Sequence, residues 1–304
     1  MTADEPTFPP GCAYVRGRYV PMKEATLSVL DWGFLRSDAT YDVAHCIDGL
    51  FFRLDAHLDR FYRSAEKLRL AIPVDKARCA EIMRECVRRG GVQEAGYVEC
   101  LITRGVSPTF SRDPRDAVPT FMVFAIPLGF ILPRERWEEG LSIHISRIHR
   151  IPPESVDPTA KNYHWHDLVQ GLYEAYDAGA ENVVLTDPAG AVCEGPGFNV
   201  FLVKDGRIAT PDRGVLEGVS RDTAIRLARD LQIPVEARAI PTDEFRAADE
   251  AFITSTAGGI MPIGRIDGRP VGPETRGGAP GPITRRLRDL YWEKHADPAW
   301  TTPV

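Results

Sequence analysis

The sequence predicts a two-domain α/β protein of the α+β kind, on three observations. Its 304 residues suffice for two ordinary domains, and 43% hydrophobic with 26% charged residues is typical of a soluble globular chain. Strand-like runs give way to helix-like periodicity in the N-terminal part. A segment containing proline and glycine, residues 129–137, separates this part from a second β-rich region. We therefore expect a small N-terminal domain over residues 1–128, a linker over 129–137 and a larger C-terminal domain over 138–304.

The N-terminal elements follow from local signals. Asp48-Gly49 is a strong hairpin turn between two β-rich runs. Apolar residues at three- and four-residue spacing then predict a helix that begins near Asp55. A second helix begins after Asp75 and ends at Gly90-Gly91. The expected strands are 13–15, 19–20, 39–47, 50–54, 97–103 and 120–128.

The C-terminal region alternates between the two kinds of pattern. Strands are expected over residues 141–148, 182–186, 199–203 and 251–254. Helices are expected over a segment that contains Leu168 and ends at Gly179, over Ser220 to Leu231, and over 284–294. Ser220 is the predicted N-cap of the middle helix. The polar segment 108–119 is predicted to be an exposed loop, which a rigid scaffold often uses for substrate contacts.

Charge and composition exclude several classes of protein. The net charge is −6, which argues against binding to nucleic acid or to an anionic membrane. No apolar run approaches the ~20 residues of a membrane span. The first ten residues, MTADEPTFPP, do not resemble a secretory signal. We therefore expect a cytoplasmic protein with small-molecule partners.

The metal-binding side chains predict no metal site. Six cysteines form no C-x-x-C motif, and the spacing of Cys79 and Cys86 predicts one buried helix face, as expected for reduced thiols. His164-x-His166-Asp167 has a spacing that suits ligands on a strand, but this segment is predicted to be helical, which would splay the two histidines.

One lysine stands out among the few that the chain contains. Lys161 follows a proline-punctuated segment and is flanked by Asn162, Tyr163, His164 and Trp165. Aromatic neighbours desolvate an amine, which lowers its pKa toward the nucleophilic range. A surface lysine beside aromatic residues is the alternative interpretation. The other lysines have solvated sequence contexts: Lys23, Lys67, Lys76, Lys204 and Lys294.

Three further motifs are candidates for binding an anion or a protonated ring. The segment 214–220, GVLEGVS, opens a predicted helix, whose N–H groups and dipole favour a phosphate. The segment 255–259, STAGG, offers hydroxyls and glycine amides after a strand. Glu194 lies beside a Gly-Pro-Gly turn that would fix its carboxylate. Each motif also has an ordinary structural interpretation as a helix start, a glycine turn or a turn-capping acid.

Together with His57-Leu58-Asp59-Arg60, these features occur in the order of one family. The chain resembles the fold-type IV aminotransferases that use pyridoxal 5'-phosphate, from about Gly11 to Trp292. The resemblance implies a small N-terminal α/β domain and a larger, β-barrel-like C-terminal domain with helices. It also implies a homodimer with its active site at the domain and subunit junction.

The family's roles carry over position by position. Lys161 resembles the lysine that forms the internal aldimine with the cofactor and moves the proton. Glu194 resembles the carboxylate that pairs with the pyridine nitrogen. Leu216 resembles the residue packed on the ring face, in a cofactor site that also includes Phe198. The phosphate site resembles the set Arg60, Val219, Ser220 and Thr256.

The substrate pocket resembles that of (R)-selective amine transaminases within this family. Val98-Glu99 follows Tyr97 where branched-chain enzymes carry an arginine-proline pair. The resemblance implies transfer of an amino group from an (R)-amine or a D-amino acid to a 2-oxo acid such as pyruvate. The alternatives are a branched-chain L-amino-acid transaminase, an aminodeoxychorismate lyase and a degenerate, non-enzymatic member. The implied substrate-binding residues are Arg36, Tyr41, Val43, Tyr97, Glu99, Arg112 and Ala257.

Overall fold

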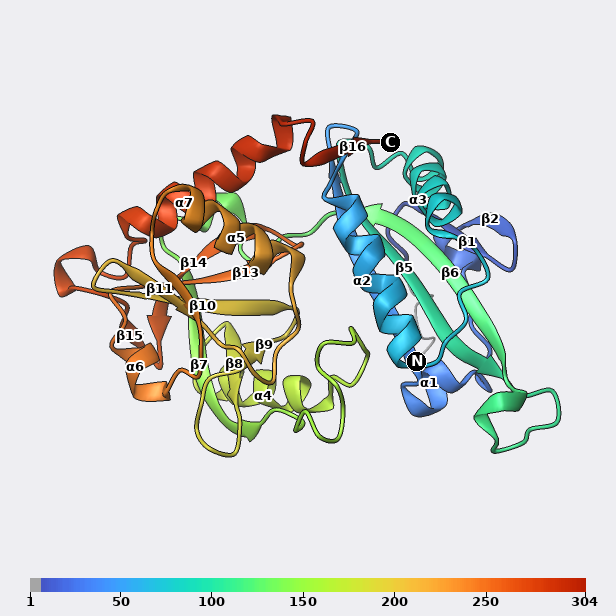
Figure 1. Cartoon of the computed structure of the whole chain (residues 1–304), viewed down its shortest axis with the longest axis horizontal. Helices are drawn as coiled ribbons and strands as arrows, with labels where there is room; N and C mark the ends of the chain where they lie inside the picture. The colour runs from blue at the N-terminus through green and yellow to red at the C-terminus, as the bar shows by residue number, and fades with distance from the viewer. Residues whose placement is uncertain (1–6) are drawn as a thin grey trace. The chain divides into compact units, whose positions relative to one another are not determined.

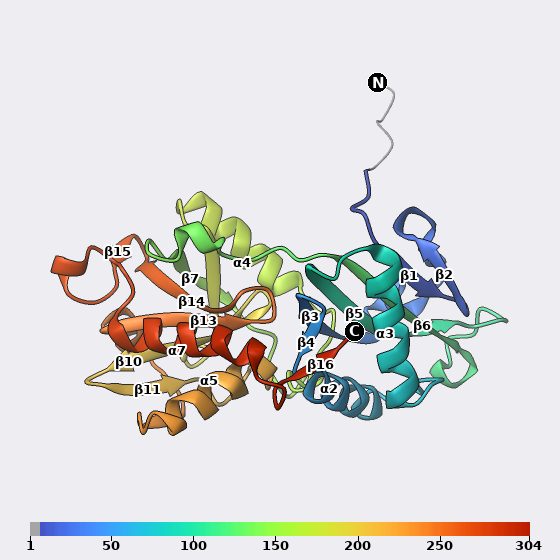
Figure 2. The same ribbon diagram turned by 90° about the horizontal axis from the view of Figure 1, so that it is seen from above.

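The computed structural model describes residues 7–304, which form two compact units. Among these residues, the first unit comprises 7–129, Ala160–Tyr163 and Asp297–Val304, and the second comprises Phe130–Thr159 and His164–Ala296. Figures 1 and 2 show the elements of each unit. Residues 1–6, which begin the stretch compared above with a secretory signal, lie outside the described residues.

The first unit is built on a seven-stranded sheet in the order β16-β4-β3-β5-β6-β1-β2, in which every neighbouring pair is antiparallel. The predicted hairpin at Asp48-Gly49 is confirmed, and Asp48 adopts the positive φ of 49° that this turn requires. The strands are β1 (Cys12–Val15), β2 (Arg18–Pro21), β3 (Ala39–Ile47), β4 (Leu50–Phe52), β5 (Ala95–Val106), β6 (Val118–Pro127) and β16 (Thr301–Pro303).

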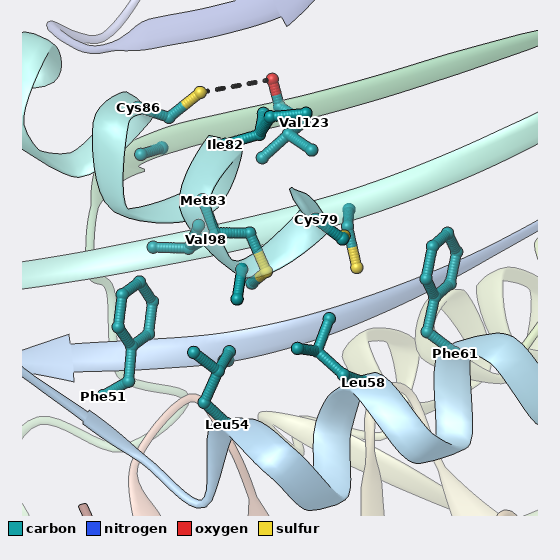
Figure 3. Packing of buried hydrophobic residues seen from close by; sticks show 14 of the residues in the cluster. Phe51, Leu54, Leu58, Phe61, Cys79, Ile82, Met83, Cys86, Val98 and Val123 are labelled. Carbon is teal, nitrogen blue, oxygen red and sulfur yellow. Dashed lines mark hydrogen bonds between the residues drawn. The ribbon is translucent and has the colours of Figure 1, made fainter. Parts of the chain in front are cut away.

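Two long helices of this unit, α2 (Leu54–Lys67) and α3 (Lys76–Gly90), pack on one face of the sheet (Figure 1). Asp75 caps α3 by accepting a hydrogen bond from the Arg78 N–H, and Gly91 ends it at φ 66°, as the sequence predicts. Figure 3 shows their apolar side chains, including Leu58 and Met83, packed together in a buried core. The short elements are α1 (Trp32–Arg36), η1 (Met22–Glu24) and η2 (Pro114–Asp116).

Alternation along β3 and β5 gives this sheet two chemically different faces. Ala44 and Cys46 on β3, with Val98 on β5, belong to the core beneath the helices. Residues of the opposite parity point the other way. Val43 is the cross-strand partner of Glu99, so Tyr41, Val43, Tyr97 and Glu99 share the face opposite to this core. Four predicted substrate residues are therefore brought together by strand register alone.

The second unit is built on a nine-stranded mixed sheet in the order β12-β11-β10-β13-β14-β7-β8, with β9 paired to β10 and β15 to β14. Its central strands are almost entirely buried, which is why they read as continuous apolar runs. The strands are β7 (Leu141–His149), β8 (Asn182–Thr186), β9 (Glu194–Gly195), β10 (Phe198–Lys204), β11 (Arg207–Thr210), β12 (Val235–Ala237), β13 (Glu250–Ser255), β14 (Gly259–Ile266) and β15 (Arg269–Pro270).

The helices of the second unit correct one prediction. The helix α5 begins at Val219 with Gly218 as N-cap, so Ser220 is its second residue and not its N-cap. A Cβ on residue 218 would lie 2.1 Å from Asn199 Oδ1, so the close approach of the Asn199 side chain requires glycine here. The helices are α4 (His166–Asp177), α5 (Val219–Asp230), α6 (Thr242–Arg246) and α7 (Pro282–Glu293), with η3 (Arg134–Arg136), η4 (Glu274–Arg276) and η5 (Lys294–Ala296).

The domain limits also differ from those predicted. Residues 130–137 belong to the second unit, because Leu132 is fully buried in its core and the Ile131 N–H donates to the Ala257 carbonyl. Residues 160–163 and the C-terminal strand β16 belong to the first unit, where β16 pairs with β4. The second unit therefore begins before the predicted C-terminal domain, 138–304, and lacks its residues 160–163 and 297–304.

Three further predictions concern cysteines, membranes and metals. All six cysteines are buried and unpaired, as predicted for reduced thiols. Within residues 7–304 no helix combines the length and the apolar character that a membrane crossing needs. The same residues contain no group of three or more histidine, cysteine or acidic side chains that could hold a metal ion, and His164 and His166 form no such group.

Candidate active site

The backbone of Lys161 is held against the first unit's sheet. On β3, β4 pairs only with the last two residues, Cys46 and Ile47. The beginning of β3 is therefore open to residues 161–162, and Asn162 forms an antiparallel bridge with Thr40 there. Thr40 Oγ1 donates to the Lys161 carbonyl at 2.5 Å, and the Lys161 N–H donates to Ser64 Oγ on α2 at 3.2 Å. This lysine is therefore fixed by a strand and a helix, although it lies in an irregular segment.

The side chain of Lys161 lies on an aromatic surface. Its Nζ is 4.2 Å from the centroid of the Tyr41 ring, which stacks on Tyr163 at 4.2 Å between centroids and 16° between planes. An amine over an aromatic face loses hydration while the ring quadrupole attracts its cationic form. The aromatic neighbour of the Lys161 amine is thus Tyr41 on β3, which is distant in sequence, and Tyr163 extends this aromatic surface by stacking on Tyr41.

A buried acid adjoins this aromatic pair. Glu99 is 6% exposed and accepts hydrogen bonds from the hydroxyls of Tyr163 at 2.5 Å and Tyr97 at 2.8 Å. Burial raises the pKa of Glu99, whereas the two tyrosine hydrogen bonds and the charge of Lys161 act against this rise. Burial and the neighbouring Glu99 also raise the pKa of both tyrosines, which therefore stay protonated donors.

Arg60 is part of a buried charged cluster. Its Nε and Nη2 donate to the two oxygens of Asp42 at 2.7 and 2.8 Å, and His57 Nδ1 lies 2.8 Å from Asp42 Oδ1. Burial would raise the pKa of Asp42, but the Arg60 charge and the hydrogen bonds outweigh this and hold the pKa well below its usual range. Asp42 thus fixes the arginine that the sequence assigns to a phosphate site.

The second unit holds Glu194 in a network of its own. Glu194 Oε2 accepts the Leu216 N–H at 2.9 Å, and Oε1 accepts Arg150 Nε at 3.2 Å. Arg150 also donates to Asp167 at 2.7 Å. Burial would lower the pKa of Arg150, but the Glu194 and Asp167 carboxylates outweigh this and raise it. The carboxylate of Glu194 is fixed on β9, as its place beside the Gly-Pro-Gly turn predicts.

The predicted phosphate-binding residues of this unit lie on two elements. Val219 and Ser220 form the first turn of α5, where helical N–H groups and the dipole favour an anion. Ser220 Oγ lies 3.1 Å from the Tyr291 hydroxyl. Thr256 follows β13 in the turn to β14, beside Ala257, whose N–H donates to Ser255 Oγ.

The remaining predicted residues fall into two groups. Phe198 is buried at the start of β10, and Leu216 is joined to Glu194 by its N–H and to Asn199 by its carbonyl. Arg36 and Arg112 are exposed, and the Arg36 guanidinium lies 4.0 Å from the Trp32 ring centroid. The two arginines are therefore exposed, whereas Tyr41, Val43 and Glu99, which were predicted to line the same substrate pocket, are buried.

Sequence reasoning missed several residues that orient the others. Asp42 was not singled out, and Tyr163 was noted only as a flank of Lys161. Asp167 was considered only within a candidate metal motif. Arg150 was not identified at all, because one arginine among 31 carries no local signal. Its partners are 17 and 44 residues distant along the chain, and only the fold brings them together.

Comparisons with known proteins identify the family. The model of the family described as amino-transferase class IV matches residues 39–266. The branched-chain-amino-acid aminotransferase of Pseudomonas aeruginosa is 30% identical over 97% of both chains, and the D-alanine aminotransferase of Staphylococcus haemolyticus is 28% identical over 91% of this chain and 95% of its own. The branched-chain amino acid aminotransferase of Thermobaculum terrenum, solved in its PLP form, superposes with a TM-score of 0.84 at 28% identity, covering 97% of this chain and 98% of that chain.

These matches span both units and support an enzyme over the degenerate, non-enzymatic interpretation. They also confirm the fold-type IV architecture and the cofactor that the resemblance implies. The chain belongs to the class IV aminotransferases, which are pyridoxal-phosphate-dependent enzymes.

Proposed function

We propose that this aminotransferase takes its amino group from a branched-chain L-amino acid and passes it to a 2-oxo acid. The observation that carries the proposal is similarity along nearly the whole chain to enzymes with that name, among them the Pseudomonas aeruginosa protein and the Thermobaculum terrenum structure. We also propose that the enzyme works as a homodimer in the cytoplasm.

An (R)-amine or D-amino acid is the second candidate donor. The specific observations that favour it are the buried Glu99, which follows Val98 where an arginine-proline pair would mark a branched-chain enzyme, and a D-alanine aminotransferase among the relatives. Handedness depends on which substituent each pocket accepts, so both candidates are compatible with one fold.

The residues present fit pyridoxal phosphate. The first unit offers one amine on an aromatic surface, and the second offers a fixed carboxylate and a helix N-terminus. In addition, Thr254 Oγ1 on β13 is buried without a hydrogen-bond partner among the described residues, opposite Asn199, whose side chain lies against the α5 N-cap. An unsatisfied hydroxyl beside the predicted phosphate site supports a polar ligand there.

Each of these residues has a distinct proposed task. Lys161 Nζ binds the cofactor and moves a proton to and from the substrate carbon. Glu194, oriented by Arg150, would accept a hydrogen bond from the protonated ring nitrogen of the cofactor. The first turn of α5 offers the N–H groups of a helix start to a phosphate. In the first unit, Arg60 is the arginine that the family resemblance assigns to phosphate binding. The cofactor, when bound, supplies the electron sink that stabilises negative charge on the substrate carbon.

A donor panel tests the proposal. Purified enzyme is given L-leucine, L-valine or either enantiomer of 1-phenylethylamine with pyruvate or 2-oxoglutarate as acceptor. Both alanine enantiomers are tested with 2-oxoglutarate, because alanine and pyruvate exchange without net reaction. We expect L-leucine and L-valine to be consumed fastest, one keto acid being aminated for each donor. Faster turnover of D-alanine or the (R)-amine would replace the first candidate by the second. Pyruvate formed from aminodeoxychorismate without a second keto acid would indicate a lyase.

A further inference from the structure

We propose that Glu99 is a specificity-determining residue that makes the enzyme discriminate against substrates with a second carboxylate. This inference rests on the proposed amino-group transfer and on Lys161 as its reacting residue. It concerns the charge of the substrate side chain, so it holds for either candidate class of donor.

The first step is the position of Glu99 relative to Lys161. Glu99 on β5 is the register partner of Val43 on β3, next to Tyr41 on the same face of the sheet. The Lys161 amine lies on the Tyr41 ring, and Tyr163 joins that ring to the Glu99 carboxyl group. A substrate that reaches Lys161 in this unit therefore meets a surface that contains Glu99.

The second step is what this surface offers to a ligand. A phenol has one hydrogen to donate, and both Tyr97 and Tyr163 donate theirs to Glu99. Their hydroxyls are thus committed as donors, and the oxygens that remain are acceptors. A substrate carboxylate is itself acceptor-only, so it would meet acceptors where it needs donors.

The third step is charge. The Glu99 side chain is almost fully buried, and a second carboxylate beside it adds like charge where little water screens it. An alkyl or aryl substituent incurs no such penalty and packs against Tyr41 and Val43, both of which are buried. The surface that contains Glu99, Tyr41 and Val43 therefore accepts apolar substituents and disfavours anionic ones.

Two keto acids of equal length test this directly. 2-Oxopentanoate and 2-oxoglutarate differ by one carboxylate. We expect the wild type to prefer 2-oxopentanoate in kcat/KM, and Glu99→Gln to move the ratio toward 2-oxoglutarate by about tenfold or more, mainly through KM. Glu99→Asp retains the charge and should keep the wild-type preference. Glu81→Gln, which removes an exposed charge from the same unit, is the matched control.

Calorimetric binding of pentanoate and glutarate to the cofactor-loaded protein gives a readout that needs no turnover. Glutarate should gain affinity in Glu99→Gln and in neither control. If Glu99→Gln does not fold, Glu99→Leu, which removes the carboxylate from a side chain of similar size, should move the preference in the same direction.

An unchanged ratio and unchanged glutarate affinity in folded Glu99→Gln would overturn the proposal, as would loss of discrimination in Glu99→Asp. Absence of amino transfer with every donor, together with a glutarate gain in Glu99→Gln, would instead contradict the proposed function alone.

Discussion

Arg60 and Asp42 form a buried, bidentate ion pair, with donor-acceptor distances of 2.7 and 2.8 Å. Arg60 is 4% exposed and Asp42 is 0% exposed. The pair joins α2 to β3, the strand that also carries Tyr41 and the bridge from Thr40 to Asn162. The arginine assigned to the cofactor phosphate is thus also a structural element of the first unit. Its replacement has consequences for stability as well as for cofactor retention.

Arg60→Ala is expected to destabilise the protein by about 3–5 kcal/mol, because it leaves Asp42 buried without its main partner. Urea unfolding measures the loss. Arg63→Ala, an exposed arginine of the same helix, should change stability by less than about 0.5 kcal/mol. The double variant Arg60→Ala with Asp42→Ala should recover part of the loss. Equal stability of Arg60→Ala and wild type would contradict this account.

Asp42 predicts a specific loss of stability in acid. Its pKa is lower in the folded protein than in the unfolded chain, so its contribution is fully present above the unfolded value of about 4 and is lost as the pH falls toward the folded value. The wild type should therefore lose more stability than Asp42→Asn between about pH 5 and pH 2. Unfolding free energies measured across this range would contradict the prediction if both proteins lost the same amount.

Glu194→Gln tests the carboxylate proposed to face the cofactor ring. Glutamine keeps an oxygen for the Leu216 N–H but removes the negative charge, while Arg150 retains Asp167. We expect kcat to fall by roughly 10²-fold or more with a smaller change in KM. Glu154→Gln, an exposed acid of the same unit that pairs with Arg213, is the control. Equal kcat in Glu194→Gln and Glu154→Gln would remove Glu194 from this role.

Arg112→Ala and Arg36→Ala test the two exposed arginines. If either anchors the carboxylate of an amino acid, its loss should raise KM for amino-acid donors by about 10- to 100-fold and leave neutral amines nearly unaffected, because only amino acids carry the anion. Arg115→Ala, in the same segment as Arg112 but paired with Asp113, serves as control. Equal effects on amines and amino acids would show that neither arginine binds the substrate carboxylate.

Elements with local signals were predictable from the sequence. Asp75 and Gly91 bound α3 as capping residues do, and Asp48-Gly49 makes its hairpin, because each of these geometries depends on a few neighbouring residues. The family resemblance grouped Tyr41, Val43, Tyr97 and Glu99, and the register of β3 and β5 shows that they share one face. The family resemblance supplied the cofactor, and it is also the source of the role proposed for Lys161.

The sequence predictions that were wrong or missing share one physical cause, because each feature depends on contacts between residues that are distant in sequence. Ser220 is a good N-cap residue, but the Asn199 side chain lies where only Gly218 fits, and the helix begins there. β16 pairs with β4, a strand near the other end of the chain, so no local pattern reveals it. Buried charges such as Asp42 and Arg150 are stable only with their partners, which the linear sequence does not identify.

The central claim is that Lys161 is the lysine that binds the cofactor. Borohydride reduction of the cofactor-loaded protein, followed by proteolysis and mass spectrometry, fixes the label on one of the six lysines. We expect the pyridoxyl group on Lys161, and no label there in Lys161→Ala, which should lack turnover yet unfold at the wild-type urea concentration. A label on Lys204 or any other lysine in the wild type would contradict the account.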